Sequence, residues 1–221
     1  MTEVITRSTA RQVAAGPIVY ILDDDESMRE ALTDLLQSMQ IASIAFETTQ
    51  AFLESFDRDR PGCILLDVRL PGMSGLDFQG HLDRIGSHMP IIFMTGFGDI
   101  PMSVRAMKAG AVDFLTKPFR DQDLLDAVTV ALDRDAKRRR ENAASDAVAS
   151  LAATLTPRER EVMAAVVEGL MNKQIAFNLG ISEITVKLHR GNVMRKMDAR
   201  SVADLVRKSE LLEASASRPT P

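Results

Sequence analysis

Several residues that could carry out phosphoryl chemistry each follow a short apolar run of the sequence. Carboxylates that lie close together repel one another unless a cation neutralises them, and carboxylate oxygens suit Mg²⁺. A carboxylate beside Mg²⁺ can attack phosphorus, while an ammonium and a hydroxyl stabilise charge on the transferred group. These residues are Asp23, Asp24, Asp25 and Glu26 after the first run, Asp67 after the third, Thr95 after the fourth and Lys117 after the fifth. Together they predict an aspartyl-phosphate site.

A structural role could also explain these residues one by one. Acidic residues at the start of a helix favour the helix dipole and can cap its first turn, so Asp23 to Glu26 are also typical of a helix N-terminus. Lys117 taken alone is typical of a surface cation. The placement of all of them after apolar runs favours the phosphoryl site.

The apolar runs have the length and composition of buried strands. Amphipathic stretches with helical spacing separate them, which predicts five strand–helix units and a parallel sheet. Because the carboxyl ends of parallel strands share one edge, the polar residues are expected to converge there. The expected strands are Ile18–Leu22, Ala42–Phe46, Cys63–Leu66, Ile91–Met94 and Val112–Leu115, and the expected helices are Ser27–Ser38, Thr49–Phe56, Ser74–Ile85, Ile100–Ala109 and one from about Asp121.

A second, all-helical domain is expected after an Ala- and Ser-rich stretch, into which the helix from Asp121 continues. Thr156 can cap a helix, Pro157 can occupy its first position and Glu159 can close a capping box. No strand-like alternation follows this start. The expected helices are Pro157–Glu168, Asn172–Leu179, Glu183–Met197 and Val202–Leu211.

The second and third of these helices have helix-turn-helix spacing, with Gly180 at the turn and Ser182 as a cap. Val186, Val193 and Met197 are expected to face the core. Side chains on the other side of the third helix would meet the major groove of DNA. A helical interaction module with solvated charges fits the same periodicity. The outward residues are Thr185, Lys187, Leu188, Arg190, Asn192 and Arg195.

The composition indicates a globular protein with two domains of different charge. The chain has 221 residues, of which 45% are hydrophobic and 26% charged, and a usual domain has roughly 100–150 residues. Residues 18–134 carry 10 Lys and Arg against 19 Asp and Glu, whereas residues 155–212 carry 10 against 7. An acidic half and a mildly basic half suggest different partners.

The sequence also bears on the expected compartment. No apolar segment reaches the roughly 18 residues of a membrane span, and residues 1–16 lack the apolar core of a signal peptide. The single cysteine, Cys63, excludes an internal disulfide and fits a reducing compartment. We therefore expect a cytoplasmic protein with no membrane partner.

The polar residues of the first half lie in motifs that resemble the receiver domain of response regulators. By this resemblance Asp67 accepts the phosphoryl group, and Lys117 and Thr95 contact it. The resemblance also implies that Asp24, Asp67 and the Arg69 backbone carbonyl bind Mg²⁺, with Asp23 acting through water. Phe114 corresponds to the switch residue that turns inward when Thr95 moves toward the phosphate. The motifs are Asp23-Asp24, Leu66-Asp67-Val68-Arg69-Leu70-Pro71-Gly72-Met73-Ser74-Gly75, Thr95-Gly96 and Lys117-Pro118-Phe119.

The second half resembles the LuxR-type DNA-binding domain. The resemblance adds Asn172 and Lys173 to the expected DNA contacts and favours Lys187 and Arg190, whereas Gly191 stands where a longer polar side chain would read bases. The motifs are Thr156-Pro157-Arg158-Glu159-Arg160-Glu161-Val162, Asn172-Lys173-Gln174-Ile175-Ala176 and Ile181-Ser182-Glu183-Ile184-Thr185-Val186-Lys187-Leu188-His189-Arg190. Both halves together are similar to the NarL/FixJ family, and Gly96-Phe97-Gly98-Asp99-Ile100-Pro101-Met102 is similar to its FixJ-like branch.

This resemblance implies an α/β flavodoxin-like (βα)5 receiver domain followed by an all-α four-helix LuxR-type helix-turn-helix domain. The expected parts are a disordered tail at residues 1–17, the receiver domain at 18–134, a helical linker at 135–154, the DNA-binding domain at 155–212 and a disordered tail at 213–221.

The expected function is that of a response regulator in a two-component system. A partner histidine kinase would donate the phosphoryl group to Asp67, and the chain would dimerise through the surface near Met102–Leu115. The dimer would bind promoter DNA and activate transcription, with RNA polymerase as a further partner. We expect no enzymatic activity beyond slow self-dephosphorylation.

Two other functions share some of these features. A Mg²⁺-dependent phosphotransfer or phosphatase enzyme would use Asp67 in the same way, but such hydrolases need a second acid two residues on, where this chain has Arg69. A phosphorylation-independent DNA-binding protein could use the receiver only to dimerise. The complete acidic set, Thr95 and Lys117 disfavour that alternative.

Overall fold

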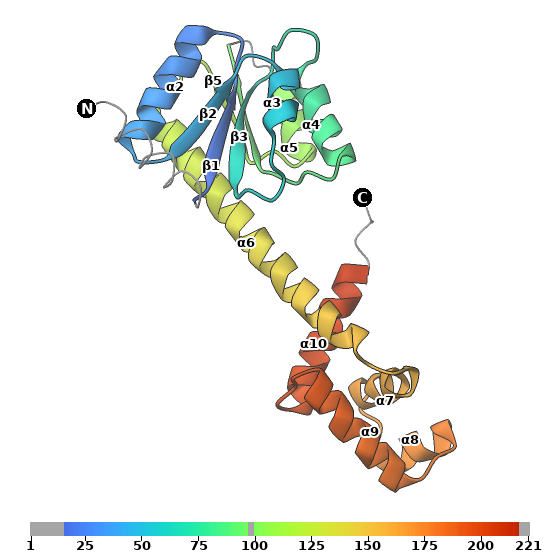
Figure 1. Ribbon diagram of the computed structural model, residues 1–221. Coiled ribbons are helices and arrows are strands. Elements are labelled where there is room, and N and C mark those ends of the chain that lie inside the picture. The colour runs from blue at the N-terminus through green and yellow to red at the C-terminus, as the bar shows by residue number, and fades with distance from the viewer. Residues whose placement is uncertain (1–15, 97–99, 217–221) are drawn as a thin grey trace, which may run out of the picture. The chain divides into compact units, whose positions relative to one another are not determined.

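The first half of the chain forms a five-stranded parallel sheet (Figure 1). The structure is a computed structural model that describes residues 16–96 and 100–216, with side chains described as far as residue 213. The strands are β1 (Ile18–Leu22), β2 (Ala42–Phe46), β3 (Gly62–Asp67), β4 (Ile91–Thr95) and β5 (Asp113–Thr116). Their order is β2-β1-β3-β4-β5, which changes direction between β1 and β3. In folds of this type the crevice beside that point, at the carboxyl ends of the strands, binds ligands.

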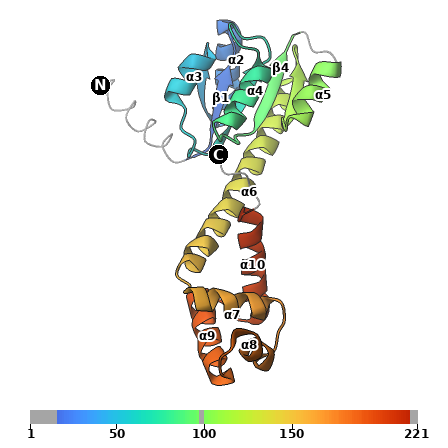
Figure 2. The same cartoon turned by 90° about the vertical axis from the view of Figure 1, so that its right-hand side faces the viewer.

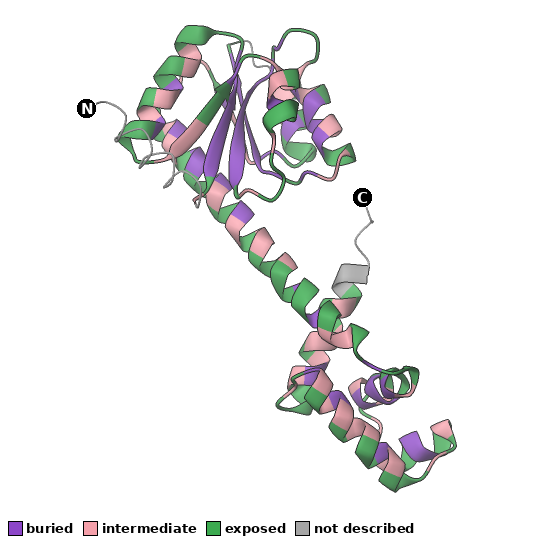
Figure 3. Ribbon diagram, in the orientation of Figure 1, coloured by how far each residue is buried: buried purple, intermediate pink, exposed green. Residues whose placement is uncertain are grey.

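Helices cover both faces of the sheet (Figure 1). One face packs against α2 (Glu26–Ser38) and the first part of α6 (Asp121–Ala153), through residues that include Leu36 and Leu124. The other face packs against α3 (Thr49–Ser55), α4 (Gly75–Arg84) and α5 (Ile100–Lys108). Strands β1, β3 and β4 are buried along their whole length (Figure 3), as expected for parallel strands covered on both sides.

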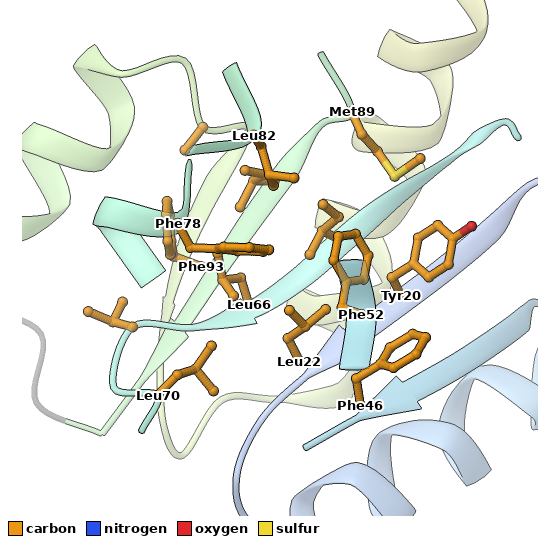
Figure 4. Packing of buried hydrophobic residues seen from close by; sticks show 14 of the residues in the cluster. Tyr20, Leu22, Phe46, Phe52, Leu66, Leu70, Phe78, Leu82, Met89 and Phe93 are labelled. Atoms are coloured by element: carbon orange, nitrogen blue, oxygen red, sulfur yellow. The ribbon is translucent and has the colours of Figure 1, made fainter. Parts of the chain in front are cut away.

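Aromatic side chains fill the layer between the sheet and α3 and α4 (Figure 4). The fully buried Phe52 ring lies edge-to-face against Tyr20 at 5.3 Å between centroids and against Phe78 at 5.7 Å. Edge-to-face pairs contribute roughly 0.5–1.5 kcal/mol beyond the burial of their area. This cluster holds β1 and β3, whose ends carry the acidic residues, in a packed core.

The second half of the chain is a helical unit with its own core (Figure 2). Its helices are the last part of α6, from residue 139, and α7 (Pro157–Val167), α8 (Asn172–Leu179), α9 (Glu183–Lys196) and α10 (Val202–Ala216). The predicted capping box is confirmed, since Thr156 and Glu159 each accept the backbone N–H of the other. Gly180 ends α8 with a φ of +63°, a conformation that glycine adopts without steric cost, and Ser182 caps α9. Val186, Val193 and Met197 are fully buried, as predicted.

The predicted elements are present with ends that differ by at most one residue, except for the last helix. The sequence predicted that this helix ends at Leu211, but α10 continues to Ala216 because Glu213, Ala214 and Ala216 are compatible with a helix. Residues 213–216 of the predicted disordered tail are therefore helical. Two parts of the predictions lie outside the described residues: tail positions 1–15 and 217–221, and residues 97–99 of the motif that is similar to the FixJ-like branch.

The predicted helix from Asp121 continues without interruption to Ala153 and so includes nearly all of the stretch expected as a helical linker. None of the helices in the described ranges is long and apolar enough to cross a membrane.

Candidate functional site

The ammonium of Lys117 joins two carboxylates at the carboxyl edge of the sheet. Its Nζ donates to Asp23 Oδ2 at 2.6 Å and to Asp67 Oδ2 at 2.7 Å. Asp23 follows β1, Asp67 ends β3 and Lys117 follows β5, so the contacts connect three strand ends. Asp23 is fully buried and Asp67 is 8% exposed. The predicted convergence of these three residues on one edge is confirmed.

The exposed carboxylate of Asp24 completes an acidic cluster that could hold a metal ion. One ligand oxygen from each of Asp23, Asp24 and Asp67 lies within 4.8 Å of the others. Three carboxylates at this spacing fit a hard divalent cation such as Mg²⁺, which prefers oxygen ligands and keeps several waters. The exposed Asp24 leaves the cluster open toward solvent.

Burial and hydrogen bonds both affect the pKa of Asp23 and of Lys117. Burial raises the pKa of Asp23 above its usual value, although the hydrogen bonds from Lys117 and from the Asp25 N–H act in the opposite direction. Burial also acts to lower the pKa of Lys117, but its hydrogen bonds to Asp23 and Asp67 outweigh burial and raise that pKa. Lys117 therefore stays protonated at neutral pH and holds a positive charge against the phosphoacceptor candidate.

Hydrogen bonds to the backbone help to position Asp67, Thr95 and Lys117. Asp67 Oδ1 accepts the N–H of Arg69 at 2.9 Å from the turn after β3, while Asp67 Oδ2 accepts from Lys117, so both oxygens of this carboxylate are held. Thr95 is buried at the end of β4, and its carbonyl accepts the Lys117 N–H at 2.7 Å. Thr95 and Lys117 are therefore joined through their backbones.

Phe114 lies apart from the acidic cluster. Its side chain is half-buried on β5 and packs against the core on the side of α3, α4 and α5, with its ring centroid 6.4 Å from that of Phe93. Phe114 lies on β5, which pairs with β4, the strand that ends at Thr95.

The acidic run after β1 divides between two roles. The Asp25 side chain caps α2 by accepting the N–H of Ser27 at 2.9 Å and of Met28 at 3.4 Å. The predicted role as a helix cap is therefore confirmed for Asp25. Asp23 and Asp24 belong to the acidic cluster with Asp67 instead. Sequence reasoning missed Arg29, whose Nη1 donates to the Asp23 carbonyl at 2.8 Å. Its position in the first turn of α2 could have indicated this contact, because that turn follows directly after the end of β1.

Gly75 brings the start of α4 into contact with the strand that carries Asp67. A Cβ at this position would lie 2.5 Å from the Asp67 backbone oxygen and 3.1 Å from Val68 Cα. Backbone atoms cannot move aside as a flexible side chain can. The absence of a side chain at Gly75 is therefore a condition for the position of Asp67.

The predicted DNA-contacting residues lie on α8 and α9. Lys173, Lys187, Leu188 and Arg195 are exposed, whereas Asn172, Thr185, Arg190 and Asn192 are half-buried. Two of the half-buried residues bind one another, since Arg190 Nη1 donates to Asn172 Oδ1 at 3.1 Å. The hydroxyl of the half-buried Thr185 lies 2.9 Å from that of the exposed Ser182. The Arg190–Asn172 contact joins the two helices of the helix-turn-helix.

Comparison with known proteins agrees with both units. Residues 19–129 match the family described as response regulator receiver domain, and residues 153–209 match bacterial regulatory proteins of the luxR family. Nodulation protein W of Bradyrhizobium diazoefficiens is 56% identical over 206 residues, which cover 93% of this chain and 91% of that protein. The transcriptional regulatory protein FixJ of Azorhizobium caulinodans is 46% identical over 193 residues, or 87% of this chain and 92% of that protein.

A solved structure of the response regulator StyR has 48% sequence identity and a TM-score of 0.80, and it covers 89% of this chain and 99% of its own. The residues that match the receiver family and the residues that match the luxR family lie in different compact units of the chain. The chain therefore belongs to the NarL/FixJ family of response regulators, which are phosphorylation-dependent transcriptional regulators and not classical enzymes.

Proposed function

We propose that Asp67 accepts a phosphoryl group from the phosphohistidine of a partner histidine kinase. The observation that carries this proposal is that the Lys117 ammonium lies 2.7 Å from Oδ2 of the buried Asp67. The neighbouring Asp24 is exposed, so the site is open to solvent on that side. Asp67 attacks phosphorus, the bond to the donor nitrogen breaks, and the histidine leaves. Lys117 and the Thr95 hydroxyl stabilise the negative charge on the transferred group.

Asp24, Asp67 and the Arg69 backbone carbonyl would bind Mg²⁺, with Asp23 acting through water. The ion would supply positive charge that offsets the repulsion between the carboxylates and the incoming phosphoryl group. Arg69 stands two residues after Asp67, where an aspartyl-phosphate hydrolase would carry an acid, and this supports slow self-dephosphorylation over phosphatase activity.

The phosphorylated receiver would change state through Thr95 and Phe114 and then dimerise. The surface near Met102–Leu115 supports this role because α5 leaves Val104 44% exposed and Met107 46% exposed. Such a change requires only a shift between two populated states.

The second unit would bind promoter DNA as a pair, with half-sites roughly 34–36 Å apart, and activate transcription with RNA polymerase in the cytoplasm. The proposed units are the receiver at residues 18–134, the linker at 135–154 and the DNA-binding unit at 155–212. The proposed DNA contacts are Asn172, Lys173, Thr185, Lys187, Leu188, Arg190, Asn192 and Arg195.

The direct test is the intact mass of the full chain after incubation with acetyl phosphate and Mg²⁺. We expect a gain of one phosphoryl group in the natural chain and none in Asp67→Asn. Asp34→Asn removes an exposed carboxylate from α2 and should still gain the group. Phosphorylation of Asp67→Asn to the same extent as the natural chain would overturn the assignment.

A further inference from the structure

Helix α9 presents one continuous outward face to solvent. Its members stand three or four residues apart or next to each other, and the opposite face carries the fully buried Val186 and Val193. All members of this outward face are exposed, and they are Ile184, Lys187, Leu188, Gly191 and Arg195. The proposed DNA contacts include three of these residues but not Ile184.

The outward face combines cations with unusually exposed apolar side chains. Ile184 is 80% exposed and Leu188 is 64% exposed, and they stand four residues apart, so their side chains are neighbours. Folding buries little of either side chain, and their apolar area can be removed from water only by a partner. Lys187 and Arg195 on the same face favour a polyanionic partner.

DNA offers one kind of apolar group to a helix in its major groove. Among the base edges there, the C5-methyl group of thymine is the apolar feature, while the other groups are hydrogen-bond donors and acceptors. The first residues of a recognition helix are those that contact base edges. Ile184 is the second residue of α9, whereas Leu188 lies one turn further along.

We propose that Ile184 is a specificity-determining residue that reads a thymine through contact with its methyl group. This inference rests on the proposed binding of promoter DNA by α9. Gly191 supports the close approach that such a contact needs, because a Cβ built at this position meets no atom within 4 Å and no side chain stands there to hold the groove away. Glu183, the acidic residue in the first turn of α9, can accept a hydrogen bond from cytosine but makes no apolar contact with a methyl group.

The test compares thymine with deoxyuridine, which differs only by the missing methyl group. The full chain, treated with acetyl phosphate and Mg²⁺, first selects a duplex from a randomised pool. Each thymine of that duplex is then replaced singly by deoxyuridine, and Kd is measured for the natural chain, Ile184→Ala and Phe177→Ala. Phe177 is the matched control because it is 87% exposed and lies on α8, outside the outward face of α9.

At one thymine position we expect deoxyuridine to weaken binding by the natural chain roughly three- to fivefold, the effect of losing one buried methyl contact. The same replacement should leave the affinity of Ile184→Ala unchanged, while Phe177→Ala should respond as the natural chain does. Circular dichroism should show that Ile184→Ala is folded, since the replaced side chain is exposed.

Two results would overturn the assignment while leaving DNA binding intact. One is tight binding with no thymine whose methyl group matters. The other is a methyl effect of the same size in Ile184→Ala, which would place the contact on a different residue. Failure of the natural chain to select any duplex would instead refute the proposed function itself.

Discussion

Lys196 Nζ lies 2.6 Å from Glu159 Oε2 and so joins the last turn of α9 to the first turn of α7. The same ammonium donates to the Thr154 carbonyl at 3.0 Å, and Glu159 closes the capping box of α7. The nearly buried carboxylate of Glu159, which is 3% exposed, therefore connects α9 to α7.

This pair predicts acid-sensitive stability of the second unit. The hydrogen bond from Lys196 and that from the Thr156 N–H lower the pKa of Glu159 from 4.5 to about 2. A lowered folded-state pKa contributes stability that is fully present above about pH 4.5 and is lost as pH falls toward 2. Glu159→Gln keeps the cap but loses the charge, so its Tm should be lower than that of the natural chain at pH 6, and the gap should narrow steadily as pH falls from 4.5 toward 2. Thermal unfolding followed by circular dichroism measures this, with Glu210→Gln, an exposed change on α10, as the control.

The contacts of Lys117 predict that its loss destabilises the receiver unit. Lys117→Met leaves the buried Asp23 without its cationic partner, which should lower the free energy of unfolding by about 1–3 kcal/mol in the presence of EDTA. Added Mg²⁺ should raise the Tm of Lys117→Met more than that of the natural chain, because the acidic cluster then lacks the Lys117 ammonium that offsets its charge. Lys108→Met on the exposed side of α5 should leave Tm unchanged. Equal Mg²⁺ effects on all three proteins would contradict this account.

The two glycines of α4 predict opposite effects of the same substitution. Gly75→Ala forces a shift of the strand end at Asp67, which should cost about 1–3 kcal/mol and slow phosphorylation by acetyl phosphate. Gly80→Ala adds a methyl group that meets no atom within 4 Å, and the better helix propensity of alanine should stabilise by about 0.5–1 kcal/mol. Chemical denaturation measures both. A Gly75→Ala variant as stable and as reactive as the natural chain would disprove the close contact.

The exposure of Lys187 predicts an electrostatic contribution to DNA affinity. If this side chain contacts a phosphate, Lys187→Gln should weaken binding to all sequences alike and reduce the slope of log K against log salt by about one per bound unit. Binding of a fixed duplex at several salt concentrations measures the slope. Lys108→Gln lies in the other unit and should leave it unchanged.

The sequence allowed the edge of the sheet and its acidic residues to be predicted, because apolar runs and the polar residues after them are local signals. It did not show that Lys117 binds Asp23 as well as Asp67, since that geometry depends on how β1, β3 and β5 are spaced in the folded sheet. The residue that caps α2 could not be identified either, because all of Asp23 to Glu26 are typical of a helix N-terminus and the turn decides that Asp25 is the cap. Hydrogen bonds such as Arg190–Asn172 join positions 18 residues apart and leave no periodic trace.

The missing side chain at Gly75 also has a genetic consequence. In a random mutagenesis screen for chains that no longer transmit a signal, alleles at this codon should be recovered together with alleles at the codons for Asp67 and Lys117. Gly75 bears no reactive group, so its loss-of-function alleles would look like active-site alleles by phenotype alone. Partial recovery of signalling on lowering the growth temperature would distinguish them, since a packing defect can be relieved by added stability and a missing carboxylate cannot.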